Sequence, residues 1–111
     1  MPTTARARGQ AKASRRKETI AEEIIEQDRE VELDPGDERA SVSATRGFKR
    51  WLGGPTGGGS VESSISVTLT CGQQETAIRQ AASVAAEMAT DMAYAGLEEM
   101  GQRLMDFMGG E

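Results

Sequence analysis

The clearest hydrophobic pattern in the chain is a strict alternation along residues 61–71. Apolar residues and Ser63 hold the odd positions, while serine, threonine and one glutamate hold the even positions. A period of two with β-branched residues on one side is typical of an antiparallel strand that buries a single face. Cys71 ends the apolar side, so we predict a buried and chemically inert thiol at this position.

The pattern changes to a helical period over residues 73–108, where alanine, glutamate, methionine and leucine dominate. Apolar residues step by three and four along two neighbouring stripes, one of which consists of small residues. This small-residue stripe comprises Ala82, Ala86, Ala89, Ala93 and Gly96. We expect a long C-terminal helix that Gly109 terminates, with Gly96 and Gly101 weakening its final segment.

A capping-box pattern predicts a short helix over residues 20–28. Thr19 holds the N-cap position, and Glu22 follows three residues later, where its side chain can reach back. Ile20 and Ile24 then fall on one stripe of the helix. A helix this short is unstable alone, so we expect it to dock on the rest of the fold.

A hairpin is predicted between this helix and the clear strand. Residues 31–33 and 40–45 alternate apolar with polar positions, and residues 34–37 form Asp-Pro-Gly-Asp, a strong turn signal. The predicted fold class is therefore α+β. It comprises a short N-terminal helix, a small antiparallel three-stranded sheet and the long C-terminal helix packed on that sheet.

The N-terminal residues 1–17 carry six cations, no acidic residue and no large apolar residue after Met1. Such a segment buries too little apolar surface to offset the entropy of ordering it. We therefore expect a disordered, flexible basic arm. Residues 18–111 are expected to form one small α+β domain with a glycine-rich loop at residues 53–60.

The composition argues against most catalytic and metal chemistry. The chain has no histidine and one cysteine, which rules out a disulfide framework, a Cys/His zinc site, a Ser-His-Asp triad and a Cys-His dyad. The paired carboxylates have no evident catalytic partner, so we expect no metal site, no cofactor and no enzymatic activity. There is neither an apolar run of about 18 residues nor a secretory signal, so we expect a cytoplasmic protein without a membrane role.

The glycine-rich residues 53–60 nearly match the phosphate-binding loop G-x-x-x-x-G-K-[ST]. Gly59 stands where the motif needs a lysine, and the segment leads into a strand instead of a helix. Without that lysine and a helix N-terminus, the segment lacks the groups that hold the phosphates. We interpret it as a flexible linker.

Basic and aromatic residues gather in residues 45–51. They are Arg46, Phe48, Lys49, Arg50 and Trp51. Interleaved cations and rings can grip phosphates and stack on bases, which is one interpretation. Because aromatic residues make up only 4% of the chain, we favour the alternative in which both rings pack in the core and the cations stay in water.

These features favour a non-catalytic, homo-oligomeric binding or assembly protein. Small residues at helical spacing let two helices approach closely, so we expect the small-residue stripe to form the oligomer interface. The basic segments are expected to contact nucleic acid or another anionic partner, such as an acidic protein surface. The expected contacts are Arg6, Arg8, Lys12, Arg15, Arg16, Lys17, Arg46, Lys49 and Arg50. The alternative is an acidic protein-binding inhibitor or adaptor without a nucleic-acid role, in which residues 18–38 make the contact.

Overall fold

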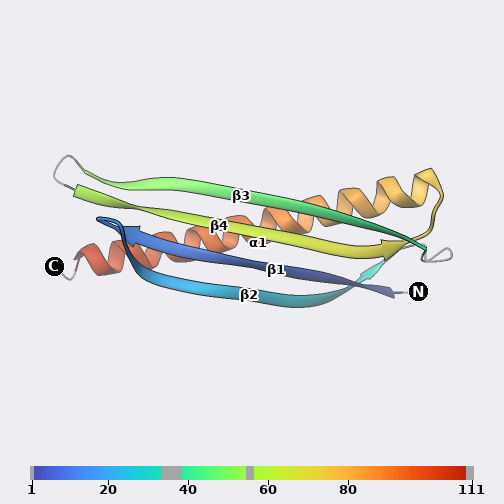
Figure 1. The fold of residues 1–111 in the computed structure, drawn as a ribbon, viewed down its shortest axis with the longest axis horizontal. Coiled ribbons are helices and arrows are strands. Elements are labelled where there is room, and N and C mark those ends of the chain that lie inside the picture. The colour runs from blue at the N-terminus through green and yellow to red at the C-terminus, as the bar shows by residue number, and fades with distance from the viewer. Residues whose placement is uncertain (1, 34–38, 55–56, 110–111) are drawn as a thin grey trace.

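Four long strands form one antiparallel sheet, and a single long helix lies along it. The computed structural model describes residues 2–33, 39–54 and 57–109. In chain order the elements are β1 (Pro2–Arg15), β2 (Glu18–Glu32), β3 (Ala40–Gly54), β4 (Gly57–Cys71) and α1 (Glu75–Gly109). The molecule measures 56 × 20 × 18 Å, and the strands run along its length (Figure 1).

The strand order across the sheet is β2-β1-β4-β3. The hairpin partners β1 and β2 pair with each other, as do β3 and β4, and the two hairpins join through β1 and β4. All three pairings are antiparallel. The two strands inside the sheet are therefore β1 and β4, and the two edge strands are β2 and β3.

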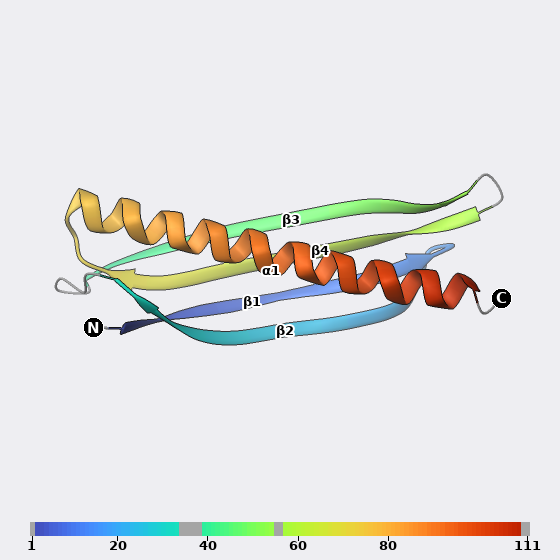
Figure 2. The ribbon, with the colours of Figure 1, turned by 180° about the vertical axis from the view of Figure 1, so that it is seen from behind.

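The helix α1 covers one face of the sheet and leaves the other face open (Figures 1 and 2). Its 35 residues form one continuous helix that passes through Gly96 and Gly101 without a break. The helix starts after the end of β4, and its C-terminal end lies near the turn between β1 and β2 (Figure 2). The architecture thus has two layers, with the core between them.

The core between the two layers is built largely of small side chains. Alternate residues of β1 and β4 point to the helix and are buried, as the period of a strand requires. The buried hydrophobic residues are Ala5, Ala7, Ala11, Ala13, Leu33, Val61, Ile65, Val67, Leu69, Cys71, Ala81, Ala85, Met88, Ala89, Ala93, Leu97, Met100 and Leu104. With alanine on both facing surfaces, the helix can lie close to the sheet. At Gly96 the fit is close, because a Cβ added there would lie 2.7 Å from Ser63 Oγ.

The predicted flexible arm is wrong, because Pro2–Arg15 is the strand β1 inside the sheet. Its alanines alternate with its cations, so the alanines fill the thin core beneath α1 while Arg6, Arg8 and Lys12 point to the open face. Large apolar side chains are not required here. Hydrogen bonding to a strand on each side and burial under the helix order the segment instead.

The short helix predicted over residues 20–28 is also wrong, because these residues belong to β2. The capping box is a local signal, and the antiparallel pairing of β2 with β1 along Glu18–Glu32 overrides it. The sheet accordingly has four strands instead of three. Only Ile25 of the two adjacent isoleucines packs on the core, while Ile24 points to the open face and is 73% exposed.

The predicted hairpin between residues 31–33 and 40–45 is half right. Residues 31–32 do end β2 and residues 40–45 do begin β3, but these strands lie at opposite edges of the sheet and do not pair. The turn predicted at residues 34–37 lies outside the described residues. The strand over residues 61–71 is confirmed within β4, as are the long helix and the burial of Cys71.

Candidate interaction surface

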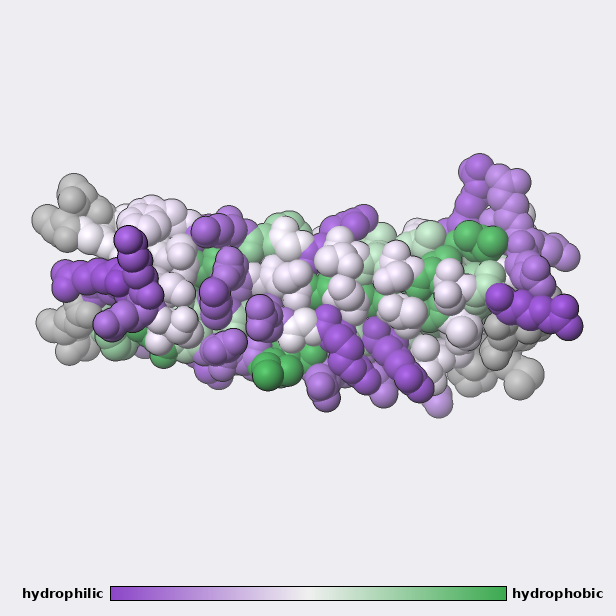
Figure 3. Space-filling view, viewed as in Figure 1, coloured by the Kyte–Doolittle hydropathy of each residue, from purple (hydrophilic) through white to green (hydrophobic). Residues whose placement is uncertain are grey.

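The open face of the sheet presents the outward side chains of all four strands to solvent. Polar residues dominate this face in Figure 3, which views the side that α1 does not cover. The four strands contribute different chemistry. Acidic residues occupy β2, cations occupy β1, and serine and threonine occupy most of β4 and the first half of β3.

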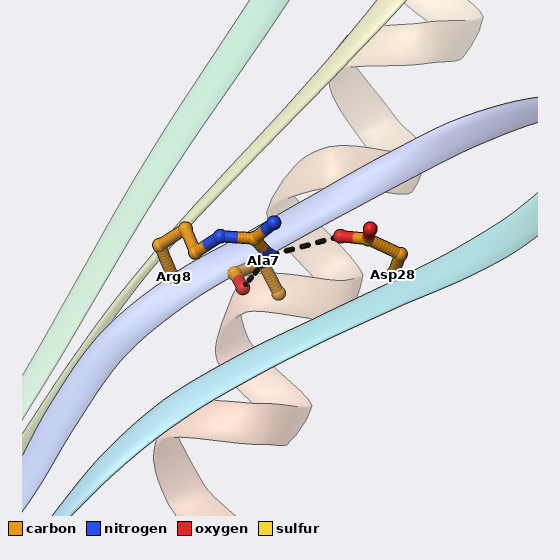
Figure 4. A network of polar contacts seen from close by, with 3 residues as sticks. All are labelled: Ala7, Arg8 and Asp28. Atoms are coloured by element: carbon orange, nitrogen blue, oxygen red, sulfur yellow. Dashed lines mark hydrogen bonds and ion pairs between the residues drawn. The ribbon is translucent and has the colours of Figure 1, made fainter.

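The cations of β1 lie beside the carboxylates of the neighbouring strands. Arg8 donates to Asp28 Oδ1 at 2.9 Å and to the carbonyl oxygen of Ala7 at 2.7 Å (Figure 4). Lys12 Nζ lies 3.0 Å from Glu62 Oε1 on β4. All four charged side chains are partly exposed, so each pair contributes little stability by itself. Both cations, which were expected to contact an anionic partner, are thus neutralised by acids of the same chain.

One row across the open face alternates in charge from edge to edge. Glu22 of β2 lies opposite Lys12, Lys12 lies opposite Glu62, and Glu62 lies opposite Lys49 of β3. Opposite charges facing each other across strands are stabilising, and this row has three such register pairs in succession, of which Lys12 and Glu62 form an ion pair. The row ends with an acid at the β2 edge and a cation at the β3 edge.

The hydroxyl side chains between β3 and β4 bond to one another. Thr45 Oγ1 and Ser66 Oγ are 2.7 Å apart, and Thr68 donates to Ser43 Oγ at 3.3 Å. These side chains satisfy part of one another's hydrogen-bonding capacity. This half of the open face is therefore compatible with water, as one face of an antiparallel sheet commonly is.

A hollow of about 370 Å³ lies at Gly47, where β3 lacks a side chain on the open face. Gln10, Lys12, Lys49 and Glu62 are among its walls. A Cβ added to Gly47 would meet nothing closer than 3.6 Å, so the glycine is not required by crowding within the chain. The hollow opens on the same row of side chains that ends at Ile24 of β2.

The two rings of residues 45–51 have different environments. Phe48 is half-buried and packs against two clusters of buried residues, one that includes Ile65 and one that includes Leu97. This confirms the preferred interpretation for this ring. Trp51 is 67% exposed, so the same interpretation is wrong for Trp51. Its register opposite Ser60 places it on the open face, two residues beyond Lys49.

A cluster on the helix side of β3 ties this edge strand to α1. Arg50 Nη1 lies 3.1 Å from Glu98 Oε1, and its guanidinium lies 5.9 Å from the centre of the Tyr94 ring. Tyr94 also meets Phe48 edge to face, with ring centres 6.2 Å apart. Hydrogen bonding to Tyr94, and then to Arg50, lowers the pKa of Glu98. Arg50 therefore serves a contact within the chain.

The last cations of the expected set lie at the turn between β1 and β2. Arg16 and Lys17 have φ angles of 53° and 66°, the left-handed geometry that a two-residue hairpin turn requires. A shallow hollow lined by Arg15, Arg16 and Phe107 places this turn beside the end of α1. The last turn of α1 carries no basic residue of its own. The cations of the turn thus lie where the negative end of the helix dipole favours them.

The nine expected contact residues therefore do not form one patch. Arg6, Arg8, Lys12 and Lys49 point to the open face, Arg46 and Arg50 lie on the helix side of β3, and Arg15, Arg16 and Lys17 lie at the β1–β2 turn.

The small-residue stripe expected at the oligomer interface is mostly used within the chain. Ala89 and Ala93 are fully buried, and Gly96 packs on Ser63 and Ala11. Ala86 is half-buried and Ala82 is exposed. Three of the five positions thus face the chain's own sheet, which covers the surface that a second helix would need.

A carboxyl pair that the sequence did not indicate joins β2 to α1. Hydrogen bonding to Glu99, burial and repulsion by the Glu99 charge raise the pKa of Glu23, although Arg103 acts in the opposite direction. Arg103 itself lies 3.1 Å from Glu99. The sequence prediction missed Glu23 because it assigned residues 20–28 to a helix. Its odd position within a strand is the signal that places it on the helix side.

Within the described residues, no group of three or more Cys, Asp or Glu side chains is placed to hold a metal ion. In the same part of the chain, no helix is both long and apolar enough to cross a membrane. Comparison with models of protein families, with curated proteins and with solved structures finds no match.

Proposed function

We propose that this chain is a non-catalytic assembly protein that associates with copies of itself by extending its sheet. The observation that carries the proposal is the pair of edge strands. Both β2 and β3 are 15 residues long, and within residues 2–33, 39–54 and 57–109 neither has a neighbouring strand on its outer side. Such an edge presents a row of unpaired backbone donors and acceptors and is a template for another strand.

The described edges lack several of the features that commonly protect an edge strand. Neither strand contains a proline, and neither is short. The helix lies on one face of the sheet and not in its plane, although its first turns project past β3 in the view of Figure 2, so it forms no strand pair with β2 or β3. Among the described residues, the edges carry one protective feature, charge, because one edge is rich in acids and the other in cations.

Self-association is tested by light scattering coupled to size exclusion over a wide range of protein concentration. We expect the mass to rise above the 11.9 kDa of one chain as the concentration increases. A mass equal to one chain at every concentration would contradict the proposed function. High salt should reduce the association, because exposed charges are screened within about 10 Å at 0.1 M salt.

An anionic partner remains a second proposal, supported by the cations at the β1–β2 turn. Pairing of Arg8 and Lys12 with acids of the chain makes the open face a weak site for nucleic acid. The turn residues Arg16 and Lys17 are exposed. Binding of duplex DNA that falls steeply with salt and is lost in Arg16→Gln/Lys17→Gln would support this second function. Equal binding by the variant would exclude it.

A further inference from the structure

The two edges of the sheet differ in charge. Strand β2 carries seven acidic residues and one arginine, whereas β3 carries three cations and no acidic residue. Pairing β2 with the β2 of a second copy would bring acids against acids, and pairing two β3 strands would bring cations together. Like charges opposite each other destabilise a strand pair, so both symmetric pairings are disfavoured.

We infer that copies of this chain associate head to tail, with β3 of one copy forming an antiparallel pair with β2 of the next. The inference rests on the proposed self-association and specifies its geometry. Strand direction permits this arrangement without rotation of the second copy. Three successive antiparallel pairings make β3 run opposite to β2, so a copy placed beside the first presents β2 in the direction that β3 needs.

The backbone pattern of the sheet is compatible with the same arrangement. Along one row, the backbone N–H and C=O groups of a residue point to the strand on one side. Those of the next residue in the row point in the opposite direction. Because the sheet has four strands, the two edge residues of any row both point inward or both point outward. An unstaggered second copy thus continues the hydrogen-bonding ladder across the junction.

The side chains of the unstaggered register are complementary at the centre of the junction. The row that ends at Lys49 begins at Glu22, so these opposite charges become neighbours across the two copies. The next row on the open face places Ile24, which is 73% exposed, opposite the hollow at Gly47. A large exposed apolar side chain then faces the position that has no side chain. The exposed Ile24 and the hollow at Gly47 would then both belong to the junction between copies.

A head-to-tail interface leaves one unused edge at each end, so it produces filaments, or rings where the rotation closes. Each added copy would extend the sheet by four strands, about 19 Å. The right-handed twist of strands would make such a filament helical. The helix layer follows on the same side of every copy.

The decisive experiment uses cysteine cross-linking between residues 24 and 47. Within one chain these positions are three strand spacings apart, about 14 Å, which exceeds the separation of about 7 Å that a disulfide tolerates. Between copies in the inferred register they are direct neighbours. Ile24→Cys is exposed and Gly47→Cys has room, so neither substitution should disturb the fold.

The double variant Ile24→Cys/Gly47→Cys is expected to give a ladder of covalent multimers under mild oxidation. Each single variant should give few cross-links, and the buried Cys71 is the same in all variants. Rapid dimerisation of Gly47→Cys alone would indicate a symmetric β3 pair and overturn the inference. If light scattering shows self-association but the double variant forms no ladder, the inference fails and the proposed function stands. If the protein is monomeric throughout, both fail.

A charge exchange provides an independent test. Glu22→Lys and Lys49→Glu are each expected to weaken self-association roughly tenfold, and the double variant should largely restore it. Inside the chain, residue 22 faces Lys12 and residue 49 faces Glu62, and the double variant leaves both internal repulsions in place. Recovery can therefore arise only between copies. The control Glu87→Lys makes the same charge change on the exposed side of α1. Failure of the double variant to recover, with circular dichroism unchanged, would overturn the register.

Discussion

Two glycines of α1 allow the packing of the helix against the sheet to be tested by substitution. A Cβ at Gly96 would lie 2.7 Å from Ser63 Oγ and 3.3 Å from the Ala11 Cβ, whereas a Cβ at Gly101 would meet only a Leu52 methyl at 3.5 Å. Alanine is preferred over glycine in a helix by about 0.8–1.0 kcal/mol. Gly101→Ala is thus expected to raise the free energy of unfolding by about that amount. Gly96→Ala gains the same preference but adds crowding of about 1–3 kcal/mol.

The informative quantity is the difference between the two variants, because the helix preference cancels in it. We expect Gly96→Ala to be less stable than Gly101→Ala by about 1–3 kcal/mol, measured by urea denaturation with helix content as the signal. Adding Ser63→Ala removes the nearest atom, a hydroxyl that is buried without a hydrogen-bond partner, and should recover part of the loss. Equal stabilisation by both alanines would refute the close packing of α1 on β4.

Three further predictions address other parts of the molecule. Deleting residues 1–17 should unfold the chain, visible as lost helix signal, because the deletion removes β1 from the inside of the sheet. Trp51→Ala should change the free energy of unfolding by no more than about 0.5 kcal/mol, whereas Phe48→Ala should cost about 2 kcal/mol or more because its ring packs on the core. Glu23→Gln should stabilise the protein increasingly as pH rises above the ordinary carboxyl pKa of 4.5. Because folding raises the pKa of Glu23, protonated Glu23 contributes fully to stability below pH 4.5, and this contribution is lost as pH rises through the pKa of the folded state. Denaturation of both proteins from acidic to neutral pH measures this, and a constant difference would contradict it.

Residues 61–71 and α1 were predictable because each carries a long, uninterrupted period. Residues 5–13 carry a weaker one, in which alanine alternates with arginine or lysine except at Gly9 and Gln10. Alanine contributes little apolar area, so the alternation does not by itself indicate a strand. It becomes meaningful once a helix of matching small residues lies above it. Part of the information that orders β1 therefore lies far away in the chain, in small residues of α1 such as Gly96, where an added Cβ would lie 3.3 Å from the Cβ of Ala11.

The candidate interaction surface could not be predicted because it depends on the order of the strands. Cations at residues 6–12 and acids at residues 22–32 are evident in the sequence, but only the register shows that Arg8 and Lys12 meet acids of neighbouring strands. The cluster of cations and rings at residues 45–51 likewise separates in a strand. Alternation sends Lys49 and Trp51 to the open face and Phe48 and Arg50 to the helix side.

The order of the strands in the sheet makes its two edges differ in charge. The cationic β1 lies between the acidic β2 and the nearly neutral β4, so β4 separates it from the cationic β3. This order places each cationic strand away from the other and gives β1 an acidic neighbour. Its consequence is that the outermost strands carry opposite charge. The two-residue turn between β1 and β2 already places an acidic strand beside a cationic one within the chain, and the inferred junction repeats that combination between β2 of one copy and β3 of another.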